Sequence, residues 1–218
     1  MYVYSKKVIH IKIIDALLSL IFPKMCLGCG KHGAYICGKC MDKMPYPEID
    51  ENSDMILAAA SYEPRLAKKA VRALKYRSAR QVSESLAQLI YARLCEDISE
   101  INPDALIPAP ISGKRRRKRG FNQAEAIAKR LSDMLDVECL TNVLYKNKDT
   151  TSQVEIKDKK ERLKNLKGAF SVKNPGLVKG KVVIVVDDVS TTGATMIEAR
   201  RALLRAGAKE VYGVVAAK

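Results

Sequence analysis

The chain has 218 residues, of which 47% are hydrophobic and 29% charged, so it is long enough to bury a core without disulfide bonds as one domain with a small appendage or as two compact domains. Aromatic residues make up 6% with no Trp, which argues against an interface built on many stacked rings. The formal net charge is +15 and favours anionic partners, namely nucleic acid, anionic lipid or phosphorylated small molecules, although an inert basic surface is the alternative.

The first 22 residues contain an apolar stretch behind two lysines and so resemble a signal peptide. Lys12 and Asp15 interrupt the stretch, and no small-residue cleavage site follows. The longest uncharged run, residues 16–23, is far shorter than the roughly 20 residues of a membrane span. We expect an amphipathic helix docked on the protein's own core, no stable membrane insertion and a cytoplasmic location; binding to a membrane surface is the alternative.

Four of the six cysteines form two Cys-x-x-Cys pairs separated by seven residues. This spacing fits a tetrahedral thiolate cage for Zn²⁺, and four ligands would make the role structural. Disulfides are disfavoured in a cytosolic chain, and an iron–sulfur cluster has no other redox feature to support it. His32 lies between the pairs as an alternative ligand. We predict a metal-binding module over residues 1–50 with these ligands: Cys26, Cys29, Cys37 and Cys40.

A polar, linker-like segment (45–54) separates this module from a second region, residues 55–218, in which strands and helices alternate. Alternation of this kind predicts an α/β fold with a mostly parallel sheet flanked by helices. The uninterrupted apolar run 182–186 is typical of a strand covered on both faces. The expected strands are 56–62, 105–107, 182–186 and 211–216; the expected helices are 65–76, 83–94, 121–135 and 196–205.

The predicted helix that begins at Phe121 has a start signal. Asn122 can cap it, and Glu125 three positions later can complete a capping box. Phe121 itself has two interpretations, a hydrophobic staple at the helix start or a ring on which a base stacks.

A polar turn follows the apolar strand 182–186, where open α/β sheets bind ligands. Its backbone N–H groups would lie at a helix N-terminus, which attracts anions, and its threonines add hydroxyl donors. Two adjacent carboxylates suit a cis-diol or a divalent cation. The alternative is an ordinary capped strand–helix turn. The residues are Asp187, Asp188, Val189, Ser190, Thr191, Thr192, Gly193, Ala194 and Thr195.

Six consecutive cations precede Phe121: Lys114, Arg115, Arg116, Arg117, Lys118 and Arg119. One small anion needs one or two of them, and the rest suit the phosphate backbone of a nucleic acid. The alternative is a solvated, flexible basic loop.

The turn after the strand resembles the motif that binds 5-phosphoribosyl-1-pyrophosphate (PRPP) in type I phosphoribosyltransferases. Other motifs stand in the order seen in ComF-family proteins of the ComFC and GntX branches, behind the same kind of cysteine module. The resemblance covers nearly the whole chain. These motifs are Ile107–Ile111, Arg119–Gln123, Thr151–Gln153 and Glu161–Phe170.

The resemblance implies a small N-terminal zinc ribbon and a type I phosphoribosyltransferase-like domain. In such a domain Asp187 and Asp188 hold the ribose hydroxyls with Mg²⁺ and are the candidate catalytic residues, and the turn 191–195 holds the 5′-phosphate. A mobile hood, residues 146–170, closes over PRPP. A short loop holds the pyrophosphate: Ala109, Pro110, Ile111, Ser112 and Gly113.

The resemblance also implies a function. ComFC proteins act in natural transformation alongside a helicase, and the GntX branch is linked to the use of DNA as a nutrient. We expect a PRPP-binding competence protein that also binds single-stranded DNA, with a competence helicase as a further partner. An active phosphoribosyltransferase is one alternative, because Asp188 is a candidate general base. An adaptor with a vestigial PRPP site is another. Lys146 and Lys148 stand near the position where relatives carry arginines, and lysine lacks the bidentate fork of arginine, which argues against transferase chemistry at that point.

Overall fold

A computed structural model describes residues 24–48, 55–62, 65–74, 79–147 and 166–218. The expected N-terminal helix, the end of the linker and residues 148–165 of the expected hood lie outside the described residues. Thr151–Gln153 and the first half of the Glu161–Phe170 motif lie outside them as well.

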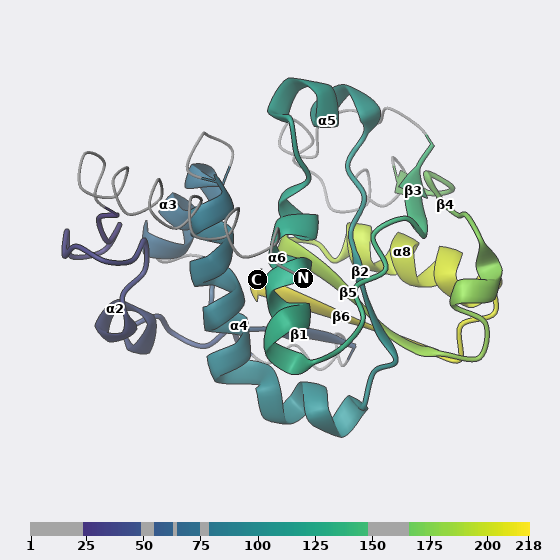
Figure 1. The fold of residues 1–218 in the computed structure, drawn as a ribbon, viewed down its shortest axis with the longest axis horizontal. Coiled ribbons are helices and arrows are strands. Elements are labelled where there is room, and N and C mark those ends of the chain that lie inside the picture. The colour runs from purple at the N-terminus through teal and green to yellow at the C-terminus, as the bar shows by residue number, and fades with distance from the viewer. Residues whose placement is uncertain (1–23, 49–54, 63–64, 75–78, 148–165) are drawn as a thin grey trace, which may run out of the picture.

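The centre of the fold is a four-stranded sheet in the order β1-β6-β5-β2, and every pair of neighbours is parallel (Figure 1). The prediction of a mostly parallel α/β sheet is therefore confirmed. Its long inner strands pair over most of their length, and Val183–Val186 are buried, as the apolar run predicts. The strands are β1 (Ile56–Ala58), β2 (Ala105–Pro108), β5 (Val182–Val189) and β6 (Glu210–Ala217).

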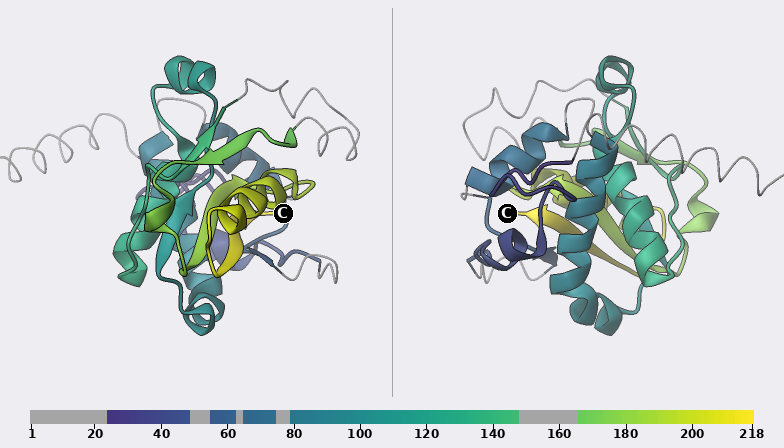
Figure 2. Two further views of the ribbon diagram at one scale, coloured as in Figure 1. Left: turned by 90° about the vertical axis from the view of Figure 1, so that its right-hand side faces the viewer. Right: turned by 60° about the vertical axis from the view of Figure 1, so that its left-hand side comes forward.

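Helices cover both faces of this sheet, and β5 shows the two faces directly. Ile184 and Val186 belong to a core with α4 (Ala79–Ile101) and α6 (Gln123–Leu135), whereas Val183 and Val185 belong to a second core with α8 (Ala194–Arg205). Figure 2 shows α8 on the face opposite α4 and α6.

The start of α8 packs closely on β6 because Gly213 has no side chain. A Cβ at this position would lie 3.1 Å from Met196 Sδ and 3.5 Å from Ile56 Cγ1. Met196 is the third residue of α8, so this contact lies directly behind the turn that joins β5 to α8.

A second, two-stranded antiparallel sheet consists of β3 (Leu144–Lys146) and β4 (Phe170–Val172). It lies on the same side of the molecule as α8 and was not predicted from the sequence. A short 3₁₀ helix, η2 (Pro175–Leu177), leads from β4 toward β5.

The basic run is helical, and the prediction of a loop is wrong. It forms α5 (Gly113–Arg119), which begins where Ser112 Oγ accepts a hydrogen bond from the Arg115 N–H at 3.4 Å. The helix ends at Gly120, whose left-handed backbone (φ 79°) reverses the chain toward α6.

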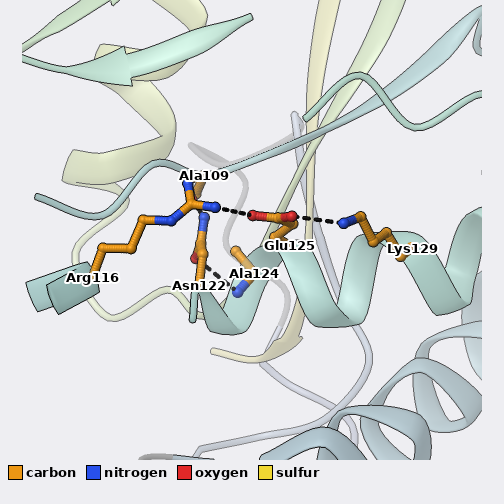
Figure 3. A network of polar contacts seen from close by, with 6 residues as sticks. All are labelled: Ala109, Arg116, Asn122, Ala124, Glu125 and Lys129. Carbon is orange, nitrogen blue, oxygen red and sulfur yellow. Dashed lines mark hydrogen bonds and ion pairs between the residues drawn. The ribbon is translucent and has the colours of Figure 1, made fainter. Parts of the chain in front are cut away.

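The start of α6 is capped as predicted, but the capping box is not formed (Figure 3). Asn122 Oδ1 accepts from the Ala124 N–H at 3.2 Å. The Glu125 carboxylate turns away from the helix start and pairs with Arg116 at 3.4 Å and Lys129 at 2.7 Å. Two cations outside the cap therefore outcompete the Asn122 N–H for this carboxylate.

Other element boundaries differ from the expected ones, most of them by one or two residues and the following by more. β1 is a short strand that ends at Ala58, and α4 is longer than the predicted helix at both ends. β5 continues three residues beyond Val186, since its later residues still pair with β6. α3 (Arg65–Ala73) ends earlier than predicted among the described residues.

The cysteine module, which includes α2 (Gly38–Asp42), contacts α4 through Arg93 and through an ion pair between Lys24 and Glu84 at 3.7 Å. The Arg93 guanidinium donates hydrogen bonds to the carbonyl oxygens of Ala59, Met41 and Met44 at 2.8, 2.6 and 2.7 Å. Ile36 and Met44 are buried in the same core as α4. No helix in the described part of the chain has the length and apolarity of a membrane span.

Candidate functional site

The two predicted acidic residues lie at the carboxyl end of β5, both half-buried. Asp187 Oδ1 accepts a hydrogen bond from the Asp188 N–H at 2.8 Å, and Asp188 Oδ1 accepts from the Val189 N–H at 2.9 Å. Each carboxylate is thus oriented by the backbone that follows it.

The environment disfavours the ionised form of Asp187. Burial raises its pKa well above 3.8, the neighbouring charge of Asp188 raises it further, and Lys146 of β3 acts in the opposite direction. Lys146 therefore carries its charge within electrostatic reach of this pair. A divalent cation or the hydroxyl donors of a sugar would stabilise the two adjacent carboxylates.

The turn from β5 leads directly into the N-terminus of α8, as the sequence predicts for a strand followed by a helix. The Ser190 N–H still pairs with Ala217 O at 3.0 Å, after which the chain leaves the sheet. Gly193 adopts the left-handed conformation (φ 72°) at the N-cap of α8, and such a backbone favours glycine. Within the described residues, no protein acceptor takes the backbone N–H groups of Thr192, Gly193 or Ala194. These N–H groups at the positive end of a 12-residue helix are suited to bind a phosphate.

The predicted pyrophosphate loop, Ala109–Gly113, meets the same edge of the sheet. β2 and β5 are neighbours, and the Ala109 N–H continues their pairing by donating to Val186 O at 2.8 Å. Asn122 Nδ2 donates to Ala109 O at 3.0 Å, so α6 holds the loop in place (Figure 3). The structure therefore brings both predicted ligand loops together on adjacent strands. Residue-by-residue analysis of the sequence missed this second role of Asn122.

The basic residues of α5 divide into two groups. Lys114, Arg116, Arg117 and Lys118 are exposed, whereas Arg115 and Arg119 are half-buried. Figure 1 shows α5, which follows β2, at the top of the view and away from the body of the sheet. Most of this charge thus faces solvent rather than lying within the site.

Gln123 is a site residue that sequence reasoning did not single out. It is 3% exposed, and its Oε1 accepts a hydrogen bond from Arg119 Nη1. Its amide Nε2 has no partner among the described residues. A buried donor without a partner costs about 1–3 kcal/mol, so the position is unfavourable unless something binds there.

The four predicted cysteine ligands converge. Their Sγ atoms all lie within 4.8 Å of one another, and the Cys29 and Cys37 sulfurs are 3.6 Å apart. A Cβ on Gly28 would lie 2.8 Å from Cys40 Sγ, so the first knuckle approaches the cluster as closely as a glycine permits. Four sulfurs at these separations fit one tetrahedral metal ion. His32 is not part of the cluster.

The thiols of this cluster differ in their pKa values. Burial raises the pKa of Cys26, but hydrogen bonds from the backbone N–H groups of Cys37, Cys29 and Gly28 outweigh it and lower that pKa to about 6. The neighbouring thiols, Cys37 first, raise the pKa of Cys40 to about 12, and burial adds to this. A divalent cation would replace the shared protons and stabilise all four thiolates. All six cysteines are free thiols, so the disulfide alternative is not realised.

Known proteins resemble this chain over most of its length. The family described as phosphoribosyl transferase domain matches residues 117–218. DNA utilization protein YhgH of Shigella flexneri is 30% identical over 195 residues, which cover 86% of this chain and 81% of that protein. Competence protein F of Haemophilus influenzae is 30% identical over 197 residues, which cover 87% of this chain and 82% of that protein. Competence protein ComFC of Bacillus subtilis is 37% identical over 112 residues, or 50% of this chain and 43% of that protein.

Solved structures also match in part. The allosteric regulatory enzyme of purine biosynthesis is 23% identical, with a TM-score of 0.39 over 63% of this chain and 25% of that chain. Purine phosphoribosyltransferase from Pyrococcus horikoshii is 26% identical, with a TM-score of 0.35 over 58% of this chain and 67% of that chain. The identity and coverage of the two long sequence relatives, and not these partial superpositions, carry the assignment: the chain belongs to the ComF family and combines a four-cysteine cluster with a phosphoribosyltransferase-like domain.

Proposed function

We propose that this protein binds PRPP with Mg²⁺ at the carboxyl end of β5, and that it binds single-stranded DNA through α5. The observation that carries the first part is the set of backbone N–H groups at Thr192, Gly193 and Ala194. Among the described residues they have no protein acceptor, and they directly follow two adjacent carboxylates.

The arrangement of the loops suits a sugar that carries phosphates at both ends. The 5′-phosphate would bind the N–H groups and hydroxyls of Thr191–Thr195, and the ribose hydroxyls would donate to Asp187 and Asp188. The pyrophosphate would lie against Ala109–Gly113. Neighbouring strands are about 4.8 Å apart, so loops on β5 and β2 can reach the two ends of one ligand.

Charge supports the nucleic-acid part of the proposal. Within the described residues, Lys114, Arg115, Arg117 and Lys118 take part in no ion pair, while Arg116 pairs with Glu125. Cations that are not neutralised by protein acids release counterions when they bind a phosphate backbone. The names of two relatives refer to DNA utilization and to competence, which agrees with a nucleic-acid partner; a competence helicase is the further partner that we propose.

We also propose that the four-cysteine cluster holds a structural Zn²⁺. Cys26, Cys29, Cys37 and Cys40 supply four thiolates and leave no open position for chemistry at the metal.

Thermal denaturation with PRPP and Mg²⁺ tests the main proposal. A ligand that binds only the folded state stabilises it by about 2.7 kcal/mol at 100 times its Kd, which corresponds to roughly 5–10 °C for a chain of this size. Asp187→Asn combined with Asp188→Asn should abolish the shift and leave oligonucleotide binding intact. Asp133→Asn, an exposed acid on α6, is the matched control. An unchanged melting temperature for the wild type would instead favour the adaptor with a vestigial site.

Transfer of ribose 5-phosphate to a base is the second candidate. The raised pKa of Asp187 favours it, because a carboxyl group with a raised pKa is a better proton acceptor once it is ionised. Incubation with PRPP and a panel of nucleobases distinguishes the two. Release of pyrophosphate that depends on the base would establish the transferase, and tight binding without release would establish the binding protein.

A further inference from the structure

Arg119 differs from the other cations of the basic run in its surroundings. It is the last residue of α5 and is half-buried, while its neighbour Lys118 is exposed. Its Nη1 donates a hydrogen bond to Gln123 Oε1 in the first turn of α6. The left-handed turn at Gly120 brings these two residues together, so the guanidinium lies at the junction of the two helices.

Gln123 holds Arg119 and also carries a donor of its own. Its Oε1 is occupied by the guanidinium, and its Nε2 is buried with no partner among the described residues. The side chain is almost fully buried. A donor kept away from water in this way requires an acceptor, and the described protein does not supply one.

The pair lies next to the candidate PRPP site. Asn122, between the two residues in sequence, holds Ala109 of the pyrophosphate loop. Burial lowers the pKa of Arg119, and the charge of Arg115 lowers it further, whereas the charge of Asp188 raises it. Arg119 is therefore an electrostatic neighbour of Asp188 as well as of its own helix.

We infer that Arg119 and Gln123 form an oxyanion-binding pair on the pyrophosphate side of the site, and that Arg119 does not belong to the nucleic-acid surface. The guanidinium supplies charge and further N–H donors, and Gln123 Nε2 supplies a neutral donor. Arg119 is thereby reassigned from the nucleic-acid group predicted by the sequence. The inference rests on the proposed PRPP site for its setting, but its chemistry concerns the pyrophosphate group alone.

Two matched variants test this assignment, Arg119→Gln and Lys118→Gln, which each remove one positive charge at adjacent positions. Titration calorimetry measures the binding of pyrophosphate with Mg²⁺, PRPP with Mg²⁺, ribose 5-phosphate and an oligothymidylate. Arg119→Gln should weaken pyrophosphate and PRPP binding by about tenfold or more, the effect of losing a charge-assisted hydrogen bond. Ribose 5-phosphate and oligothymidylate binding should change little. Lys118→Gln should weaken only oligothymidylate binding.

Variants of Gln123 separate ligand binding from support of the fold. Gln123→Glu keeps an acceptor for Arg119 but replaces the amide donor with negative charge, so pyrophosphate binding should weaken by at least as much as in Arg119→Gln. Gln123→Met keeps a similar side-chain volume but removes both the acceptor for Arg119 and the amide donor. Melting temperatures without ligand show whether each variant is folded. If folded Gln123→Glu binds pyrophosphate as the wild type does, the inference is wrong.

The ligand series separates this inference from the proposed function. Wild-type PRPP binding that survives Arg119→Gln unchanged would overturn the inference and leave the PRPP site standing. Pyrophosphate binding that depends on Arg119, together with no measurable PRPP or ribose 5-phosphate binding, would support the inference and overturn the proposed function. Loss of oligothymidylate binding in Arg119→Gln with pyrophosphate binding retained would return Arg119 to the nucleic-acid surface.

Discussion

The carboxyl group of Asp187 is withdrawn from water near the end of β5, and the charge of Asp188 lies next to it. Both effects raise its pKa, so the folded protein retains this proton at a pH where the unfolded chain has released it. The free energy of unfolding therefore falls as the pH rises from 3.8, the ordinary value, through the raised pKa of the folded state. The ionised carboxylate of Asp187 therefore costs the folded protein stability when no ligand is bound.

We predict that Asp187→Asn stabilises the ligand-free protein at neutral pH. The amide has no charge to desolvate, so the variant should lose this part of the pH dependence. For a chain of this length, each ~1 kcal/mol corresponds to ~2–4 °C in melting temperature. Melting curves of the wild type and the variant between pH 5 and 8 measure the effect, with Asp133→Asn as control. Curves that run parallel across this range would contradict the prediction.

The turn between β5 and α8, which we propose as the anion site, could be predicted from the sequence as a turn because its residues are consecutive. Asp187 through Thr195 follow an apolar strand, and their order alone indicates a strand, a turn and a helix start. The role of Gln123 could not be predicted in this way. The contact between Gln123 and Arg119 forms because the turn at Gly120 directs the end of α5 toward the start of α6. Local sequence patterns do not reveal this turn.

At the scale of the elements, α8 connects the turn proposed to bind phosphate with the second sheet. The N-terminus of α8 presents the N–H groups of this proposed phosphate turn. One turn later, buried Glu198 accepts a hydrogen bond from the Gly168 N–H at 2.7 Å, next to β4, and pairs with Arg201 at 3.0 Å. The same helix therefore positions the phosphate turn and the start of the β4 strand.

The cysteine cluster is predicted to contribute its metal-binding energy to the stability of its module. Cys26→Ser should release Zn²⁺ and lower the melting temperature, because the remaining three thiolates no longer enclose the ion. Metal content by mass spectrometry and thermal denaturation measure this. Cys95→Ser, a half-buried thiol outside the cluster, should retain the metal. Full retention of zinc in Cys26→Ser would disprove the four-thiolate site.

Arg93 is predicted to hold the cysteine module against α4. Arg93→Ala removes three hydrogen bonds to carbonyl oxygens, and we expect a loss of about 3 kcal/mol, in the range found for bonds to charged donors. Urea unfolding measures it, and Arg72→Ala on the exposed side of α3 is the control. Bound zinc should remain, because the ligands are untouched. A loss below about 0.5 kcal/mol would mean that apolar packing alone fastens the module.

The elements that escaped prediction share a physical reason. β3 and β4 have three residues each, too few to show an alternating pattern. α5 is cationic at six of its seven positions, so it has no apolar face to mark a helix, and its end caps decide its conformation instead. Longer elements with a buried face, such as β5 and α6, were predicted to within a few residues.

At the scale of the whole molecule, the net charge of +15 predicts binding to DNA that weakens steeply with salt. Each phosphate contact to a single strand contributes about 0.7 to the slope of log K against log salt. Neutralising residues 114–118 should reduce that slope by up to about 3.5, as measured by oligonucleotide binding at several salt concentrations.

A matched control comes from α3, whose four cations lie on a different part of the molecule: Arg65, Lys68, Lys69 and Arg72. Their neutralisation should leave the slope nearly unchanged. If the slope of log K against log salt is unchanged in the α5 variant and falls strongly in the α3 variant, the nucleic-acid surface lies on α3.

The alternation of strands and helices is a property of the whole chain, and it was enough to predict the parallel sheet. The position of the cysteine module against α4 could not be predicted from the sequence. It depends on hydrogen bonds from Arg93 to carbonyl oxygens 34 to 52 residues away in sequence. Because every residue has a backbone carbonyl, the sequence does not show which of them Arg93 contacts.

The absence of a side chain at Gly213 has a consequence for how this protein can vary. A methyl group there would lie 3.1 Å from Met196 Sδ and 3.4 Å from its Cγ, so the Met196 side chain in the first turn of α8 would have to shift by a few tenths of an ångström. The turn proposed to bind a phosphorylated sugar thus rests on the packing between Met196 and Gly213, and a substitution at Gly213 would act on this packing without direct contact with the proposed ligand.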